Sequence, residues 1–415
     1  MSICLKDFGV VCALGDSKAA VIAGLLTGSR SGLVLDSELP NAEPQYVGRV
    51  PDAAFDKTTF NKTTLNKTVS SAENDANGQM LTRNDKLGQL AYLQIADTLA
   101  PLIAEFGQQR IAVVIGTSTS GIEYGEQALK QKLATGEYPD NYHYKMQEMG
   151  TTAQFIADLC QAKGPVYSIS TACSSSGKAL VSAQALLEAD LADVVIAGGV
   201  DSLAKLTVNG FKALASTATA QNNPFSADRD GINIGEAAAL FVVTKEQGGI
   251  QLLGAAETSD AHHLSAPHPE GEGALRAMQG ALAEAQLQGS QIDYVNLHGT
   301  GTPKNDDMEA KAMFNACGSE VLCGSTKGMT GHTLGAAGAL EAGICWLLLH
   351  DEYNPEHKVP ANVSDGEVDN SLATINLVNA KANAERTAKN KLQTCMSNSF
   401  AFGGNNISLV IGKQQ

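Results

Sequence analysis

The chain has 415 residues, of which 43% are hydrophobic and 18% charged, enough apolar material for one very large core or two ordinary ones. Its formal net charge of −15 argues against binding nucleic acid through a general basic field. The longest strongly apolar run, residues 343–349, is far shorter than the ~20 residues that a membrane-spanning helix needs. We therefore expect a protein with no membrane span and no nucleic-acid partner.

Apolar segments of strand and helix type alternate along the chain, which predicts an α/β fold. Most of the expected strands end in loops of small and polar residues, where the active sites of such proteins gather. The expected strands cover residues 111–115, 166–169, 193–199, 292–297 and 321–326, and the expected helices cover residues 178–190 and 334–349.

The two halves of the chain follow the same plan. In segments 166–189 and 321–350, a strand ends in Ser-Thr, a loop carries a reactive side chain, and a helix of small residues follows. The sequence identity between them is too weak to establish a repeat alone, but a shared architecture explains the pattern. The polar segment 245–249 is the best boundary, so we place the N-terminal half at residues 1–248 and the C-terminal half at 249–415.

Cys173 lies in the run STACSSSG, residues 170–177, between an expected strand and an expected helix. A thiol at a helix start faces unpaired backbone N–H groups, which favour the nucleophilic thiolate. The small neighbours leave room for a substrate carbonyl, so we interpret Cys173 as a nucleophile. A packed structural thiol fits this segment alone equally well, because free cysteine is among the most buried residue types.

The remaining cysteines indicate the compartment. The eight cysteines show no metal-ligand pairing such as C-x-x-C, and Asp7 and Asp16 interrupt the weakly apolar start at residues 3–14. We therefore expect a cytoplasmic protein with reduced thiols, no disulfide framework and no zinc.

Two of the eight histidines lie beside expected strand ends or helix starts. His298 directly follows a strand, and His332 precedes a helix. A buried structural histidine is the alternative for each taken singly, but together with Cys173 they predict a Cys-His-His site. Lys327 adds a charge nearby, and Glu309, on the helix between the two histidines, is its expected ion partner. An ordinary solvated lysine is the alternative for Lys327.

Six sequence motifs are spread over nearly the whole chain. They are STACSSSG at 170–177, PFSADRDG at 224–231, SDAHHLSAPHPEGEG at 259–273, LHGTGTPKND at 297–306, STKGMTGHTLGAAGALEA at 325–342 and NSFAFGGNN at 398–406. In order and spacing these motifs resemble those of the β-ketoacyl-acyl-carrier-protein synthases of the KAS I/II type. This resemblance implies the thiolase-like fold, with two duplicated halves in five αβαβα layers, and usually a dimer.

The resemblance implies decarboxylative condensation of malonyl-carrier protein with an acyl group held on Cys173, which extends the chain by two carbons. His298 and His332 are expected to bind the malonyl thioester carbonyl and to stabilise the enolate as CO2 departs. Decarboxylation drives the bond formation, so no metal or nucleotide cofactor is expected, and the substrates are carried on phosphopantetheine.

Further roles follow from the same resemblance. The backbone N–H groups of Cys173 and Phe402 are expected to form an oxyanion hole, and Phe402 is similar to the gating phenylalanine of the family. Thr300 and Thr302 match residues that contact the phosphopantetheine arm.

The implied partners are acyl carrier protein and a second subunit, either a copy of this chain or a related ketosynthase or chain-length factor. The carrier is acidic, so docking predicts a local basic patch, for which a solvated loop is the alternative. Candidates for that patch are Lys57, Lys62, Lys67, Arg83 and Lys86.

Departures from the family pattern bear on the pathway. Ala401 replaces a usual Gly, Asn405 replaces a usual Thr, and Lys178 follows the CSSSG run, a form similar to ketosynthases of specialised pathways such as aryl polyenes. A housekeeping fatty acid elongation enzyme and a non-catalytic chain-length-factor-type subunit are the alternatives. The latter typically lacks the nucleophile. A thiolase needs a second active cysteine, in a C-x-G-x-G context that residues 395–398 do not supply.

Overall fold

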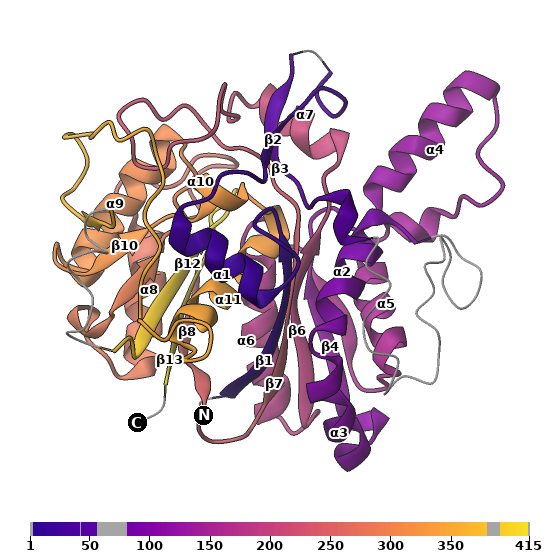
Figure 1. The fold of residues 1–415 in the computed structure, drawn as a ribbon, viewed down its shortest axis with the longest axis horizontal. Coiled ribbons are helices and arrows are strands. Elements are labelled where there is room, and N and C mark those ends of the chain that lie inside the picture. Colours follow the sequence, from indigo (N-terminus) through magenta and orange to yellow (C-terminus); the bar gives the residue numbers. More distant parts are fainter. Residues whose placement is uncertain (1–2, 42, 56–80, 380–390, 414–415) are drawn as a thin grey trace.

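The computed structural model describes residues 3–41, 43–55, 81–379 and 391–413 (Figure 1). Among them, eleven strands form one mixed sheet in the order β11-β10-β9-β12-β13-β8-β1-β7-β6-β4-β5, and β2 and β3 form a separate hairpin. The strands are β1 (Ile3–Cys12), β2 (Leu33–Asp36), β3 (Gln45–Gly48), β4 (Ile111–Gly116), β5 (Val166–Ile169), β6 (Val194–Asp201), β7 (Ala237–Thr244), β8 (Ile250–Ser259), β9 (Tyr294–Asn296), β10 (Leu322–Gly324), β11 (Asn376–Leu377), β12 (Thr394–Phe400) and β13 (Asn405–Lys413).

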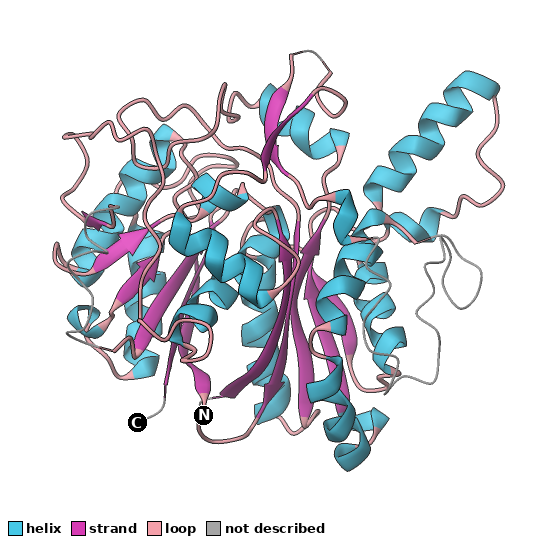
Figure 2. Ribbon diagram, in the orientation of Figure 1, coloured by secondary structure: helices cyan, strands magenta, loops and turns pink. Residues whose placement is uncertain are grey.

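Helices pack on both faces of the sheet, and some of them lie in the middle of the molecule, as Figure 2 shows. Short 3₁₀ turns lie at residues 52–54, 108–110, 144–147, 289–291 and 334–336. The α-helices are α1 (Lys18–Thr27), α2 (Arg83–Leu93), α3 (Ala96–Phe106), α4 (Ile122–Thr135), α5 (Gly150–Cys160), α6 (Ser175–Glu188), α7 (Lys205–Ala213), α8 (Glu272–Ala285), α9 (Pro303–Cys317), α10 (Lys327–Thr330) and α11 (Ala337–Leu349).

The strand order contains the same pattern twice. In the first half the order is β1-β7-β6-β4-β5, and in the second it is β8-β13-β12-β9-β10, with β11 added at the edge. In the first half, the β1–β7 and β7–β6 pairings are antiparallel, and the β6–β4 and β4–β5 pairings are parallel. In the second half, the β8–β13 and β13–β12 pairings are antiparallel, and the β12–β9 and β9–β10 pairings are parallel. The predicted duplication of an α/β fold is therefore confirmed.

The layers follow from which helix covers which strands. Helices α6 and α11 pack against each other, with α6 against β4 and β6 of the first half and α11 against β12 and β13 of the second. Helices α2 and α5 cover the outer face of the first half, and α8 covers β8 and β13 on the outer face of the second, with α9 packed on α8. This arrangement is the predicted five-layer αβαβα fold.

Continuous apolar strands allow both faces of the sheet to be buried, since successive side chains point to opposite faces. In β4, Ala112 and Val114 join the central core, whereas Ile111, Val113 and Ile115 join the outer core beneath α2 and α5. The central core also takes residues from α6, α11 and strands of both halves, so the halves share one core. The predicted boundary at residue 248 falls in the connection between β7 and β8 and stays a prediction.

Helix α11 is buried along its whole length. Each of its thirteen residues is buried, and its only charged side chain is that of Glu341. The helix predicted at residues 334–349 begins at Ala337 instead, because Leu334 has a positive φ of 53° and residues 334–336 form a 3₁₀ turn. Within the described residues, no helix is both long and apolar enough to cross a bilayer.

Candidate active site

Cys173 lies in the tight connection between β5 and α6. Ala172 has a positive φ of 54°, an unfavourable conformation for a residue with a side chain. The connection is held by the Ser175 hydroxyl, which accepts from the Thr171 N–H at 2.9 Å and donates to the Ala172 carbonyl at 2.5 Å. The strand–turn–helix predicted around Cys173 is therefore confirmed, and the turn presents the thiol at the carboxyl end of β5.

His298 follows β9 directly, as expected, and a carboxylate fixes its backbone. Glu309, on α9, accepts the His298 N–H at 2.7 Å and the Gly299 N–H at 2.6 Å. Gly299 is required here, because a Cβ at its φ of 33° would lie 2.4 Å from the Cβ of Ser325. Glu309 therefore shapes the turn that carries the histidine.

His332 lies between α10 and the 3₁₀ turn at 334–336. Its N–H donates to the Asn233 carbonyl at 2.7 Å, and its carbonyl accepts the Gly235 N–H at 2.8 Å. The Leu334 N–H donates to its Nδ1 at 3.2 Å. These bonds fix both the backbone and the ring of the histidine.

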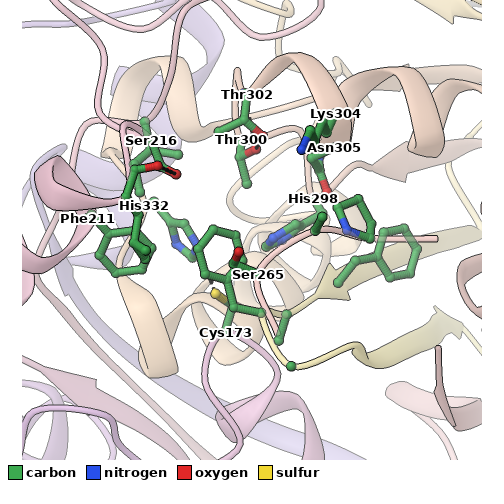
Figure 3. A pocket seen from close by; sticks show the side chains of 18 of the residues that line it. Cys173, Phe211, Ser216, Ser265, His298, Thr300, Thr302, Lys304, Asn305 and His332 are labelled. Atoms are coloured by element: carbon green, nitrogen blue, oxygen red, sulfur yellow. Dashed lines mark hydrogen bonds between the residues drawn. The ribbon is translucent and has the colours of Figure 1, made fainter. Parts of the chain in front are cut away.

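The structure brings the three predicted residues together. Figure 3 shows the sulfur of Cys173 close to the ring of His332, with His298 beside them. The Cys173 Sγ lies 3.0 Å from His332 Nε2, and the rings of His298 and His332 are 5.3 Å apart and nearly perpendicular. One ligand-type atom from each of the three lies within 4.8 Å of the others, and all three side chains are buried. The predicted Cys-His-His constellation exists in the fold.

The hydrogen bonds define the tautomers of the two neutral imidazoles. His332 Nδ1 accepts from a backbone N–H, so its proton resides on Nε2. His298 Nδ1 lies 3.4 Å from the Lys327 Nζ, and an ammonium has only donors, so the proton of His298 also resides on Nε2. The site therefore holds two N–H donors close to one thiol.

Lys327 pairs with a different carboxylate from the one predicted. Its Nζ contacts Glu341 on α11, and both side chains are almost fully buried. The expected ion pair with Glu309 is wrong, because Glu309 is occupied by two backbone N–H groups. A solvated lysine is wrong as well, since Lys327 is fully buried.

Burial is the largest influence on the pKa values of the titratable side chains in the site. It raises the pKa of Glu341 to about 7 against the opposing effect of Lys327, and the pKa of Glu309 to about 7 against that of its N–H donors. Burial, and next the charge of Lys327, hold the pKa values of His298 and His332 well below their ordinary value. Both histidines are therefore neutral at physiological pH.

The expectation that Cys173 favours thiolate is wrong for the resting site. Burial raises its pKa to about 11, although Lys327 and the backbone N–H groups of Phe402 and Cys173 lower it. Helix α6 begins only at Ser175, and the desolvation of a fully buried sulfur outweighs the effect of the helix start.

A cavity of about 310 Å³ reaches Cys173, His298 and His332 from the surface. Thr300 and Thr302, whose hydroxyls are 2.9 Å apart, line it, and their contact with a phosphopantetheine arm stays a prediction. Phe402 also lines it, and its ring contacts that of Phe211 on α7 at 5.4 Å between centroids. The cavity is lined further by Ser216, Asp260, Ser265, Pro267, Lys304, Asn305, Phe400 and Ala401.

The predicted docking patch is only partly described. Lys57, Lys62 and Lys67 lie outside the described residues. Arg83 is bound by Glu236 and Asp52, and Lys86 is half-buried on α2. The patch stays a prediction.

Sequence reasoning missed Glu341, Asp201 and Phe211. Glu341 carried a signal, because a single carboxylate in an otherwise apolar helix needs a buried partner. Phe211 and Asp201 carried no local signal, since only the folded chain brings them to the site.

Comparisons with known proteins agree with this geometry. The family profile described as "Beta-ketoacyl synthase, N-terminal domain" matches residues 9–248, and the one described as "Beta-ketoacyl synthase, C-terminal domain" matches residues 250–358. This chain belongs to the β-ketoacyl synthase family. The synthase is therefore an acyltransferase that catalyses a condensation to a 3-oxoacyl product.

Two individual relatives show how similar the sequences are. The synthase is 32% identical to a 3-oxoacyl-[acyl-carrier-protein] synthase 2 of Vibrio harveyi over 348 residues, 79% of this chain and 81% of that protein. It is 31% identical to the protein of the same description from Coxiella burnetii over 346 residues, 77% of this chain and 78% of that protein.

Among solved structures, a chain of "Ketosynthase (ApeO) in Complex with its Chain Length Factor (ApeC) from Xenorhabdus doucetiae" is 38% identical to the synthase. The match has a TM-score of 0.86 and covers 100% of this chain and 98% of that one.

Proposed function

We propose that the synthase holds the growing acyl group on Cys173 and uses His298 and His332 as neutral donors to the malonyl thioester. The observation that carries this proposal is that His298 and His332, each with a hydrogen-bond donor at Nδ1, lie beside one buried thiol. Neutral imidazole donors stabilise developing negative charge in a dry site without losing a proton.

In the first half-reaction, Cys173 Sγ attacks the thioester carbonyl of acyl-carrier protein. The backbone N–H groups of Cys173 and Phe402 hold the oxyanion, and the carrier's phosphopantetheine thiolate leaves and takes up the proton lost by the cysteine. The product is an acyl-Cys173 thioester and free carrier.

In the second half-reaction, malonyl-carrier protein enters along Thr300 and Thr302. Its C–CO2 bond breaks, the electron pair forms an enolate, and the enolate oxygen accepts from His298 and His332. The enolate carbon then attacks the acyl carbonyl, forming the new carbon–carbon bond, and Cys173 leaves as thiolate, which takes a proton from solvent. CO2 and a 3-oxoacyl-carrier protein are released.

Intact mass spectrometry tests this scheme directly. A panel of acyl-carrier proteins should load one acyl group on the synthase and none on Cys173→Ala. His298→Ala and His332→Ala should still load but release CO2 from malonyl-carrier protein at least about a hundredfold more slowly, the loss expected for an oxyanion donor. If no carrier loads the wild-type chain, the enzymatic role is refuted and a non-catalytic partner subunit is the better description.

We further propose that side chains and phosphopantetheine-bound substrates suffice for the reaction. The two imidazole donors occupy the role that a metal ion fills in Lewis-acid catalysis. Dialysis against EDTA should leave the condensation rate unchanged; a loss that added metal restores would overturn this proposal.

For the pathway, we propose a specialised polyene system rather than housekeeping elongation. The 38% identity to a chain of the ApeO–ApeC complex supports it, since it exceeds that to the fatty-acid-type relatives named above. Condensation assays with polyunsaturated or aryl acyl-carrier proteins should run faster than with saturated chains of equal length. Equal or slower rates would favour the housekeeping role.

A second ketosynthase-fold subunit, a copy or a chain-length factor, is the proposed partner. Among the described residues, β5 is the last strand of the sheet and has one unpaired edge, and α4, which projects from the body in Figure 1, exposes Leu129 and Leu133. Leu133→Asp should weaken the association in light scattering, whereas Val368→Asp, at a similarly exposed apolar residue outside the helices, should not. Equal effects would remove α4 from the interface.

For location we propose the cytoplasm, because all eight cysteines are buried free thiols.

A further inference from the structure

One fully buried carboxylate near the site has no part in the reaction scheme above. Asp201 ends β6, and five donors surround it. Its Oδ1 accepts from the Thr117 hydroxyl, the Ser118 N–H, the Thr119 N–H and the Thr119 hydroxyl, each at 2.8 Å. Its Oδ2 accepts the Gly335 N–H at 2.6 Å. Every group hydrogen-bonded to this carboxylate is a donor.

The two oxygens of Asp201 connect the two halves of the fold. Oδ1 binds the loop after β4, in the N-terminal half, and Oδ2 binds the turn before α11, in the C-terminal half. Gly335 is required for this approach, because a Cβ there would lie 2.8 Å from Oδ2 and 2.8 Å from Ser118 Oγ.

The turn that Asp201 holds contains a strained residue. Leu334 has a φ of 53°, a conformation that a branched side chain adopts only when its surroundings impose it. Its side chain is buried among Val47, Leu203 and Ile234, and its neighbour Gly335 is bound by Asp201. Packing on one side and the Asp201–Gly335 bond on the other therefore keep Leu334 in this conformation.

The strained residue in turn sets the proton position of His332. The Leu334 N–H donates to His332 Nδ1, which leaves the ring proton on Nε2, 3.0 Å from Cys173 Sγ. We propose that Asp201 is a positioning residue that, through the Leu334–Gly335 turn, fixes the tautomer and orientation of His332. This inference rests on the proposed role of His332 as an Nε2–H donor.

The variant Asp201→Asn tests the proposal with little change of shape. Its amide has one acceptor and one donor end, and the acceptor end will face the four donors of the β4 loop. The NH2 group then opposes the Gly335 N–H, so the turn moves and Leu334 releases His332. We expect the kcat for decarboxylation of malonyl-carrier protein to fall at least about tenfold, a fraction of the loss on deleting an oxyanion donor, with KM within twofold.

A spectroscopic readout separates positioning from stability. In histidine-labelled synthase, the ring ¹⁵N signals of His332, identified by their absence in His332→Asn, should report one Nε2–H tautomer in the wild type and a mixture in Asp201→Asn. Asp293→Asn is the matched control, because Asp293 accepts the Gln393 and Thr394 N–H groups at the opposite end of the sheet. It should lower stability without altering the His332 signals.

An unchanged His332 tautomer and a kcat within twofold in folded Asp201→Asn would overturn the inference, as would an equal kcat loss in Asp293→Asn. If Asp201→Asn does not fold, Gly335→Ala, which disturbs the same contact from the other side, is judged by the same criteria. If His332→Asn itself retains full decarboxylation, the proposed function fails, while the tautomer signals still decide the role of Asp201.

Discussion

Replacing Lys327 with Met should separate the catalytic and structural roles of the buried lysine. The methionine keeps the apolar stem but leaves Glu341 without its cation in a fully buried position. Removing one partner of a buried ion pair costs about 3–5 kcal/mol, so the free energy of unfolding should fall by that amount. His298 Nδ1 also loses the donor 3.4 Å away. A hydrogen bond to a charged group contributes about 1.5–3 kcal/mol, which predicts a decarboxylation rate lower by roughly 10- to 150-fold.

The double variant Lys327→Met/Glu341→Leu is the decisive comparison. It removes the orphaned carboxylate, so urea unfolding should recover most of the lost stability. The decarboxylation rate, measured as CO2 release from malonyl-carrier protein, should stay low because His298 still lacks its donor. If the rate recovers together with the stability, Lys327 does not set the tautomer of His298.

Three further outcomes follow from the site. Glu309→Gln should destabilise the fold by about 1–3 kcal/mol in urea unfolding and slow decarboxylation, because one of two backbone N–H groups at His298 loses its acceptor; an unchanged rate would contradict its role. Alkylation of Cys173 by iodoacetamide, followed by intact mass, should rise about tenfold per pH unit from pH 7 to 9, because the thiolate grows with pH below a pKa of about 11; a plateau near pH 7 would mean an activated thiolate. Phe211→Ala should let a bulky maleimide reach Cys173 faster, since Phe402 loses its ring contact, and an unchanged rate would count against that contact.

Much of the fold and the three central side chains could be predicted from the sequence. Apolar runs of strand length, each followed by a small-residue loop, identify parallel strands whose carboxyl ends meet at one edge of the sheet. Cys173 and His298 both follow such strands, so their meeting required only that the two halves face each other. That arrangement of the halves is what the family resemblance implied.

The partner of Lys327 depended on three-dimensional reach, which spacing does not reveal. Glu309 and Glu341 lie on helices at comparable distances along the chain, and two backbone N–H groups already occupy the first of them. The prediction that Cys173 favours thiolate was wrong for a related reason. The local segment of Cys173 reveals the helix start, but the burial of the sulfur that outweighs it exists only in the folded chain.

The proton positions on the two imidazoles have a consequence for metal ions. A thiol and two histidines with ligand atoms within 4.8 Å of one another form the kind of ligand set that zinc binds in many proteins. A ligating nitrogen must present a lone pair, yet the lone pairs of both rings point away from Cys173, toward Lys327 and the Leu334 N–H. Zinc could bind here only by moving both ring protons against those donors and by taking a proton from a thiol of raised pKa. The hydrogen bonds that set the two N–H donors therefore also oppose the binding of thiophilic metal ions to this site.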